Sequence, residues 1–203
     1  MAKTKDNSRE KEILNAAKDV FQIKGMDGAR MQEIADKAGI NKAMLHYYYR
    51  SKQLLFEAVF KNAFALLAPQ LNAVLNDDSS IEEKIRNFTK NYISFISKHS
   101  YLPSFIIQEL NRNPDFILKM KDKQGFPNLD KFKGQVAKEI EKGILKPIKG
   151  EQLFINILAL SIFPFVASPL VKAFTDTNNA EFKQLMDDRK IEVADFIINS
   201  IKA

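Results

Sequence analysis

The sequence predicts an all-α protein, with an N-terminal three-helix region that contains a helix-turn-helix and a larger helical region behind it. Apolar residues recur every three or four positions along most of the 203 residues, which is the spacing of one helix face. Capping residues precede several of these runs. Only seven glycines and seven prolines are present, too few for long loops, and 45% of the residues are hydrophobic, enough for a core.

The first predicted helix begins after Asn7, because Asn7 with Glu10 three residues later forms an N-cap signature. Residues 1–6 before it are predicted to be a flexible basic arm. Gly25 should end this helix. Its apolar face consists of Ile13, Leu14, Ala17, Val20 and Phe21.

A second helix is predicted over residues 30–37, and a third begins almost at once. Gly39 can take the left-handed conformation that ends the second helix, and the side chain of Asn41 can cap the third. Two short helices joined by so tight a turn must cross steeply. This is the helix-turn-helix arrangement, whose second helix enters the major groove of DNA.

The outward face of the third helix suits a phosphate-bearing partner. If Leu45 faces the core, then Tyr48 and Tyr49 lie beside it. The opposite face carries small, aromatic and thioether side chains with no carboxylate; its members are Ala43, Met44, His46 and Tyr47. The alternative is a small solvated helix whose tyrosines are half-buried packing.

Ser51 is expected to cap a long fourth helix that Pro69 ends or kinks. Ser80 with Glu83 forms a capping box for the next helix. The apolar positions of the fourth helix are Leu54, Leu55, Ala58, Val59, Leu66 and Leu67, and those of the fifth are Ile81, Ile85, Phe88, Tyr92, Phe95 and Ile96.

Three further helices are predicted before residue 144. One runs from Pro103 to Leu110, and another starts at Asn113-Pro114 and ends near Lys123. The third passes through Phe132 to Gly143.

Gln152 to Val171 is a run of twenty uncharged residues, long enough to cross a membrane. Asn156, Ser161, Ser168 and two prolines argue against a span. A helix buried on two sides, by the core and by a partner subunit, explains the composition better. The last helix would complete that interface with Phe182, Leu185, Ile191, Phe196, Ile197 and Ile201.

The positive charge is concentrated at the N-terminus. Residues 1–52 carry a net charge of +4 and the other 151 residues +2, which modestly favours a nucleic-acid partner for the first region. The chain has no cysteine, which suits a reducing cytoplasm, and no signal peptide is visible at its start.

Residues with the spacing of a catalytic site are missing. We find no phosphate-binding loop, dinucleotide fingerprint or serine-nucleophile motif. His46 and His99 lie in different regions without acidic residues at metal-ligand spacing. We therefore expect no enzyme, no metal and no cofactor.

A set of spaced residues between Ile13 and Lys52 indicates a family. The set comprises Ala17, Phe21, Gly25, Ile34, Ala35, Ala38, Gly39, Ile40, Leu45, Tyr48, Ser51 and Lys52. It resembles the DNA-binding domain of the TetR family of bacterial transcriptional regulators, whose pattern includes I-A-x-x-A-G-[VI] and L-Y-x-Y-F-x-[SN]-K. The chain departs from it at Ala29 and Met44, where threonine is usual, so Asp27 or Gly28 would have to cap the second helix.

The resemblance implies a DNA-binding domain over residues 1–52 and a ligand-binding and dimerisation domain over residues 53–203. Two classes of DNA contact follow from it. Lys42 and Ala43, with Gln32 and Met44 beside them, would approach base edges, and Arg30, Tyr47, Tyr48 and Lys52 would bind phosphates.

The resemblance also implies a homodimer through the last two helices and a small-molecule pocket in the second domain. Fifteen of the sixteen phenylalanines follow residue 52, and some could line that pocket. The candidates are Phe88, Tyr92, Phe95, Phe105, Glu109, Phe116, Phe132 and Phe163. Glu109 either turns inward or forms a surface ion pair with Arg112.

The sequence thus predicts a cytoplasmic, homodimeric, ligand-responsive transcriptional regulator, most simply a repressor. A small apolar or amphipathic molecule would release it from a pseudo-palindromic operator. The alternative is a helical protein that binds small molecules or partners and no longer binds DNA, for which the departures at Ala29 and Met44 are the best support.

Overall fold

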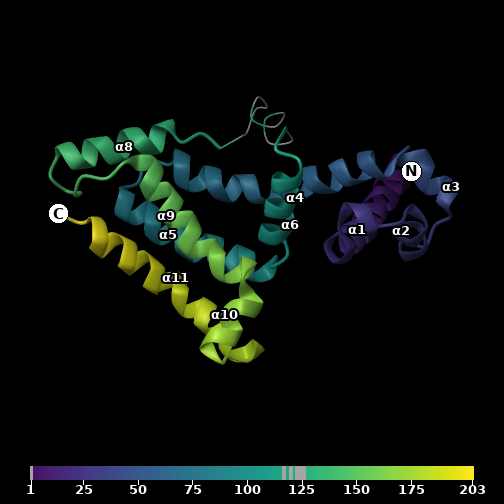
Figure 1. Cartoon of the computed structure of the whole chain (residues 1–203). Helices are drawn as coiled ribbons and strands as arrows, with labels where there is room; N and C mark the ends of the chain where they lie inside the picture. The colour runs from purple at the N-terminus through teal and green to yellow at the C-terminus, as the bar shows by residue number, and fades with distance from the viewer. Residues whose placement is uncertain (1, 116–117, 119–120, 122–126) are drawn as a thin grey trace. The chain divides into compact units, whose positions relative to one another are not determined.

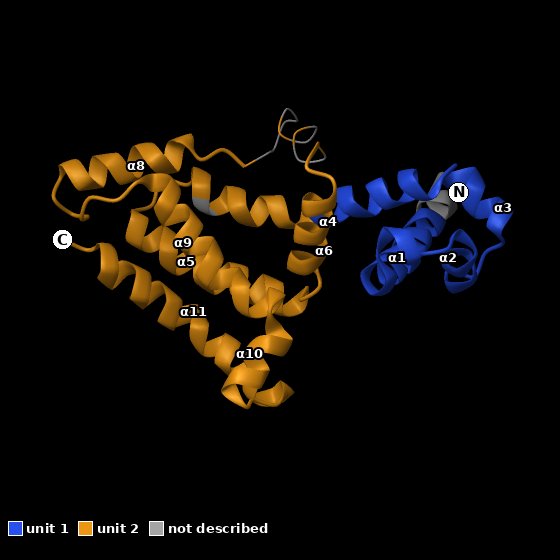
Figure 2. Cartoon of the chain, viewed as in Figure 1, with its two compact units in different colours: residues 1–65 blue, residues 66–203 orange. Residues whose placement is uncertain are grey.

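The computed structural model describes all residues except 1, 116–117, 119–120 and 122–126. In the described part every regular element is a helix, apart from one isolated β-bridge between Leu145 and Lys202 (Figure 1). The all-α prediction is confirmed. The chain forms two compact units, residues 1–65 and residues 66–203 (Figure 2), and the predicted functional division at residue 52 stays a prediction.

The first unit contains α1 (Ala2–Gly28), α2 (Met31–Lys37), α3 (Lys42–Tyr48) and the first part of α4 (Lys52–Asn76). Its core includes an edge-to-face pair of rings, Phe21 on α1 and Phe56 on α4, with centroids 4.9 Å apart. The other fully buried side chains include Ile13, Ala17, Ile34, Ala35, Leu45, Leu55 and Phe60. α4 thus closes the core around which α1, α2 and α3 pack.

Two predictions about the ends of these helices were wrong. α1 begins at Ala2 rather than after Asn7, because no glycine or proline interrupts the residues before Asn7 and they can propagate the helix. Neither Asp27 nor Gly28 caps α2. Its N-cap is Arg30, in an extended conformation and without a side-chain cap bond. Gly25 was predicted to end the first helix; its φ of 65° interrupts the helical backbone there, although α1 continues to Gly28.

α4 answers two predictions. Pro69 lies inside the helix, which continues to Asn76, so Pro69 does not end it, and a kink there stays a prediction. Leu54 and Leu66, both assigned to the apolar face, are exposed. Phenylalanine side chains that the predicted stripe omitted are buried in this helix, among them Phe60. Ser51 caps the helix as predicted, with its Oγ accepting a hydrogen bond from the Leu54 amide at 3.2 Å.

The second unit is built around α5 (Ile81–Lys98), which packs along α11 (Asn179–Ile201) and also contacts α8 (Asp130–Glu141) and α9 (Gly150–Val166). α6 (Leu102–Arg112) and α10 (Ser168–Thr175) contact α9. The capping box at the start of α5 is confirmed. The helix predicted from Asn113 to Lys123 falls largely outside the described residues.

The uncharged run forms two helices rather than one, because α9 and α10 meet at an angle of 81°. By length and composition alone, this bent pair and the stretch Lys52–Ala73 of α4 pass as membrane spans within the described residues. Core helices of globular proteins share that composition. Leu153, Ile157 and Phe165 are buried, whereas Ile155 and Phe163 are exposed, so α9 has one core face and one open apolar face.

Candidate nucleic-acid interface and ligand cavity

The turn between α2 and α3 has the predicted geometry. Gly39 has a φ of 66°, the left-handed conformation that glycine adopts without strain. The Ile40 amide donates to the Ala35 carbonyl at 3.0 Å, which closes the end of α2. Asn41 Oδ1 accepts from the Met44 amide at 2.7 Å and caps α3. The relative direction of α2 and α3 is therefore set by local hydrogen bonds.

α3 divides into a buried side and an open side. Leu45 is fully buried, whereas Tyr47 is 82% exposed. Tyr47 stands edge-to-face against Tyr48, with ring centroids 5.6 Å apart. Lys42, Ala43, Met44 and His46 are exposed as well, and the helix contains no acidic residue. This face can approach a polyanion without repulsion from its own side chains.

Tyr49 anchors the C-terminal end of α3 to α1. Its hydroxyl donates to Glu10 Oε1 at 3.0 Å, across 39 positions of sequence. Burial, together with the hydrogen bond to the Glu10 carboxylate and its charge, raises the pKa of Tyr49 well above the ordinary tyrosine value. Tyr49 therefore stays a neutral donor at any physiological pH and holds α3 in place.

Lys52 holds the link between α1 and α2. Its Nζ donates to the carbonyl oxygens of Asp27 at 3.2 Å and Ala29 at 3.1 Å. An ammonium has three N–H donors, so one remains for a phosphate. The sequence suggested the phosphate role for Lys52 but not this positioning role, which depends on residues more than twenty positions away.

The acidic residues near α2 are engaged by side chains within the unit. Lys24 Nζ lies 2.6 Å from Glu33 Oε1, and Gln32 Nε2 donates to Asp36 Oδ1 at 2.7 Å. Arg30 and Gln32 are exposed. The eight predicted DNA contacts thus all lie in the first unit; Tyr48 and Lys52 are half-buried, and the other six are exposed. Their roles toward DNA stay predictions.

A cavity of about 340 Å³ lies between the C-terminal part of α4 and α5 in the second unit. It is lined by Gln70, Ala73, Asp77, Asn87, Phe88, Asn91 and Tyr92. Phe88 and Tyr92, both predicted pocket residues, stack with ring centroids 4.5 Å apart. Burial raises the pKa of the Tyr92 hydroxyl, which is therefore a neutral hydrogen-bonding group.

The amide side chains of this cavity were missed from the sequence. Asn87 and Asn91 are four residues apart on α5, so they share one helix face next to the apolar stripe. That spacing was the available signal. Gln70 joins them only through the packing of α4, which no local pattern of α5 reveals.

The other predicted pocket residues do not line this cavity. Phe105 and Phe132 are buried, Phe95 is half-buried, and Phe163 is 56% exposed on α9. Phe116 lies outside the described residues. These side chains stay predictions as ligand contacts.

Glu109 turns inward, which was one of the two predicted alternatives. It is 3% exposed, and its Oε1 accepts a hydrogen bond from Asn113 Nδ2 at 2.6 Å. The surface position expected for an ion pair with Arg112 is therefore wrong.

A buried lysine joins the end of α4 to α5. Lys84 is fully buried, and its Nζ lies 2.6 Å from Asp77 Oδ1 and 2.8 Å from the Asp77 carbonyl oxygen. Burial opposes ionisation of Asp77, but the hydrogen bonds from Lys84 and Ser79 outweigh it and hold the pKa of this carboxyl below its ordinary value. The pair fixes the rim of the cavity, because Asp77 also lines it.

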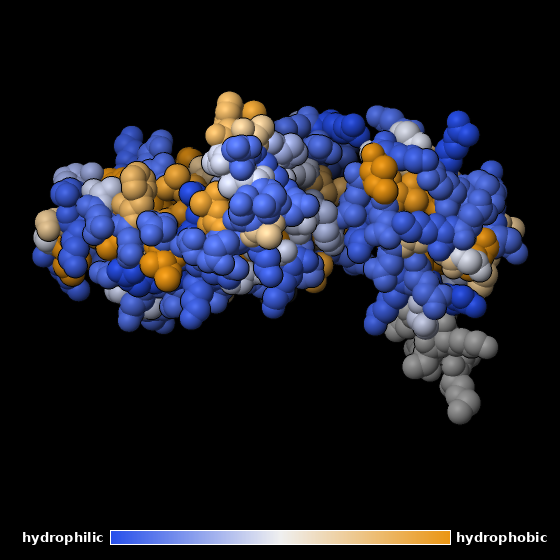
Figure 3. Space-filling view, turned by 90° about the horizontal axis from the view of Figure 1, so that it is seen from below, coloured by the Kyte–Doolittle hydropathy of each residue, from blue (hydrophilic) through white to orange (hydrophobic). Residues whose placement is uncertain are grey.

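Apolar side chains are exposed along α9, α10 and α11. On the face drawn in Figure 3, hydrophobic surface forms separate patches among hydrophilic residues. The exposed apolar residues of these helices are Ile155, Phe163, Val166, Leu170, Phe174, Ile191 and Phe196. The stripe predicted for the last helix mixed two faces, since Phe182, Ile197 and Ile201 are buried but Ile191 and Phe196 are exposed.

The chain is similar in sequence to a family of bacterial regulators and to individual members of it. Residues 13–59 match the family model described as bacterial regulatory proteins, tetR family. The HTH-type transcriptional regulator RutR of Escherichia coli (strain K12) is 24% identical over 169 residues, which is 83% of this chain and 79% of RutR. The HTH-type transcriptional repressor NicS of Pseudomonas putida is 27% identical over 149 residues, 72% of this chain and 61% of NicS.

Solved structures share the fold over nearly the whole chain. A TetR-family transcription regulator from Marinobacter aquaeolei VT8 superposes with a TM-score of 0.68 at 14% identity and covers 98% of both chains. A TetR-family transcriptional regulator from Haemophilus influenzae Rd has a TM-score of 0.66 at 15% identity, again over 98% of both chains.

Proposed function

We propose, from the premise that this chain belongs to the TetR family of bacterial regulatory proteins, that it is a ligand-responsive transcriptional repressor acting in the cytoplasm. The family consists of DNA-binding regulators rather than enzymes, and the chain is one of these regulators. Two copies of α3 would enter successive major grooves of a pseudo-palindromic operator.

The open face of α3 carries the proposal. Tyr47 is almost fully exposed on a helix whose only fully buried side chain is Leu45, so a large aromatic ring is presented to solvent with no structural role in the core. Lys42 and Ala43 begin this helix, where side chains can reach base edges, and the phenols and Lys52 supply donors for phosphates. A helix that is only solvated is not expected to expose a large aromatic ring beside basic residues.

A homodimer through the last helices is supported by the exposed apolar residues of α9, α10 and α11. Phe174 and Phe196 are 81% and 67% exposed, and rings of this size are rarely left in water on a monomer. A twofold axis would place the patch of one subunit against the same patch of the other. Such a dimer also supplies the second copy of α3 that a palindromic site requires.

The cavity between α4 and α5 is the proposed ligand site. Its walls combine the stacked rings of Phe88 and Tyr92 with the amides of Gln70, Asn87 and Asn91. Such walls suit an amphipathic molecule with an apolar face and hydrogen-bonding groups. Because α4 begins directly after α3, a ligand that prefers one position of α4 would change DNA affinity by that preference alone.

The second candidate function is a helical binding protein that no longer binds DNA. It is favoured by Met44 and Ala29, where the family usually has threonine. A selection of bound duplexes from random DNA with the full-length chain separates the two. The repressor predicts enrichment of a twofold-symmetric motif; the alternative predicts no enriched sequence over that obtained with Tyr47→Ala.

A further inference from the structure

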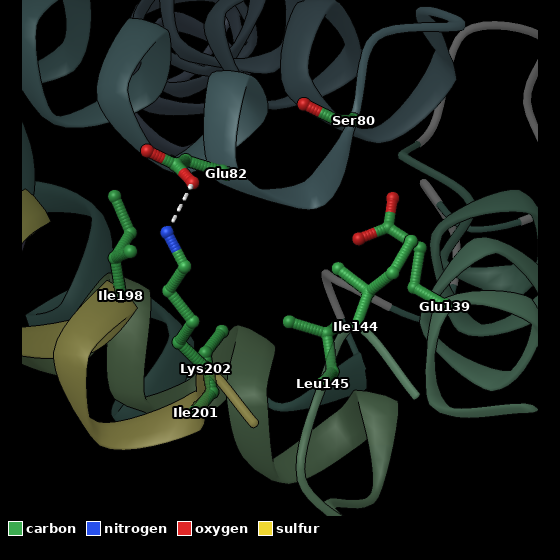
Figure 4. Close-up of a pocket in the computed structure, with 8 residues that line it drawn as sticks. All are labelled: Ser80, Glu82, Glu139, Ile144, Leu145, Ile198, Ile201 and Lys202. Atoms are coloured by element: carbon green, nitrogen blue, oxygen red, sulfur yellow. Dashed lines mark ion pairs between the residues drawn. The ribbon is translucent and has the colours of Figure 1, made fainter. Parts of the chain in front are cut away.

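A second cavity, of about 140 Å³, lies where the start of α5 meets the end of α8 and the end of α11. Figure 4 shows its lining residues arranged around an opening, with Glu82 and Lys202 on one side and Glu139 on the other. It shares no lining residue with the cavity between α4 and α5. It is therefore a separate candidate site.

The floor of this cavity is apolar. Leu145, Ile198 and Ile201 are buried side chains that nevertheless line it. They are held by backbone hydrogen bonds, because the Lys146 amide donates to the Ile201 carbonyl at 2.7 Å and the Ala203 amide donates to the Ile144 carbonyl at 3.2 Å. The chain end is thus fastened to the loop after α8, and the floor is fixed in shape. A volume near 150 Å³ lined by aliphatic side chains holds a benzene-sized group.

The rim carries two carboxylates that each offer an oxygen. Arg86 binds Glu82 Oε1 at 3.1 and 3.2 Å, while Glu82 Oε2 is met by Lys202 Nζ at 3.9 Å, beyond hydrogen-bond length. Glu139 Oε1 accepts from the Ile81 amide at 3.0 Å, and its Oε2 has no hydrogen-bond partner within the described residues. A cation at the opening would therefore find acceptors on both sides.

The cavity should bind an anion more weakly than a cation. The start of α5 attracts negative charge, but two of its amides are already bound within the chain: the Ile81 amide donates to the Glu139 carboxylate, and the Glu83 amide donates to the Ser80 hydroxyl of the capping box. Of the described residues that line the cavity, Lys202 alone is basic, and its side chain is 65% exposed. The charge pattern of the rim thus selects a cation.

The cavity stays open in the proposed dimer. Phe196, on the exposed apolar face, and Ile198, on the cavity floor, are two residues apart on α11, which places them on nearly opposite sides of the helix. A partner that covers Phe196 therefore leaves Ile198 accessible from the cavity.

We propose that this cavity binds a small primary amine with an apolar body of benzene size. The apolar body of the amine would lie on Leu145, Ile198 and Ile201. Its ammonium would bind Glu82 and Glu139 and replace Lys202 Nζ, which lies 3.9 Å from Glu82 Oε2. The site is independent of DNA binding, and nothing in the proposal requires the repressor function to hold.

The test uses the full-length protein with labelled isoleucine methyl groups and three probes that share one ring: benzylamine, benzyl alcohol and benzoate. The proposal predicts saturable shifts of the Ile198 and Ile201 methyl signals with benzylamine. Benzyl alcohol should bind about two- to fivefold more weakly, the range of a partly exposed ion pair, and benzoate more weakly still.

Variants assign the effect to the rim. Glu82→Gln should lower benzylamine affinity toward that of benzyl alcohol, because only Glu139 then faces the ammonium, and should leave benzyl alcohol affinity unchanged, which also shows that the variant is folded. Glu192→Gln, an exposed site on α11 outside this cavity, should change neither. The proposal is overturned if benzylamine shifts neither methyl signal, if the three probes bind equally, or if benzoate binds best.

Discussion

Replacement of Lys52 by alanine tests the structure and the DNA contacts together. The variant loses two hydrogen bonds from a charged donor, to the carbonyls of Asp27 and Ala29. Each such bond contributes about 1.5–3 kcal/mol when buried. The Asp27 carbonyl is exposed and regains water, whereas the bond to the part-buried Ala29 carbonyl is lost without replacement. We therefore expect a fall of about 1–2 kcal/mol in the free energy of unfolding.

The same variant should lose a phosphate contact if the third N–H of Lys52 reaches the DNA backbone. The slope of log K against log salt should then fall by about one unit per subunit, and binding to all sequences should weaken alike. Urea denaturation measures the first effect. Fluorescence anisotropy with an operator duplex, across a series of salt concentrations, measures the second.

Lys61→Ala is the matched control, because Lys61 is an exposed lysine of the same helix. It should change stability by less than about 0.5 kcal/mol and leave the salt slope unaltered. Wild-type stability of Lys52→Ala would refute the positioning role. A reduced stability with an unchanged slope would remove the phosphate role and keep the positioning role.

Three further predictions concern α3, the buried ion pair and the subunit interface. Tyr47→Ala should lower operator affinity, measured by anisotropy, at least about tenfold, and should shift the thermal midpoint by no more than about 2 °C. Leu45→Ala, at the buried side of the same helix, should cost about 2–5 kcal/mol of stability. A large loss of stability for Tyr47→Ala would mean that its ring belongs to the core. The pKa of Asp77 is lowered by folding, so its stabilising effect is present above the ordinary carboxyl pKa and is lost as the pH falls through the lowered value. Urea midpoints should therefore drop on acidification, and less so in Lys84→Met; equal acid dependence in both proteins would contradict the pairing. Phe196→Asp should convert the dimer to a folded monomer in sedimentation velocity, and an unchanged sedimentation coefficient would exclude α11 from the interface.

Local sequence patterns predicted the helix-turn-helix well, because its geometry depends on neighbours. Gly39, Asn41 and Leu45 lie within six positions of one another and act through one backbone conformation, one cap and one buried side chain. The capping box at Ser80 is equally local. Such features follow from residue type and spacing alone.

Contacts between distant segments were not predictable in the same way. Tyr49 meets Glu10, and Lys52 meets Asp27, only after the first unit has packed. The aromatic bias of the second region indicated a pocket but not which rings line it, since most phenylalanines are core. Phe163 illustrates why composition is not enough: its neighbours in sequence are apolar and suggested burial, yet its side chain lies on the exposed face of α9.

The two helices that begin with an asparagine cap provide the most direct test of the account. Ala43 and Ala180 are exposed alanines at the second position of α3 and of α11, capped by Asn41 and Asn178. A glutamate in the first turn of either helix is compatible with folding, because it complements the helix dipole.

Operator affinity of Ala43→Glu, compared with Ala180→Glu, measures whether the open face of α3 meets DNA. We predict that Ala43→Glu retains wild-type stability and loses at least about a hundredfold in affinity, since a carboxylate against the duplex costs several kcal/mol, and that Ala180→Glu binds as wild type. Equal affinity of the two variants for the operator would contradict the account.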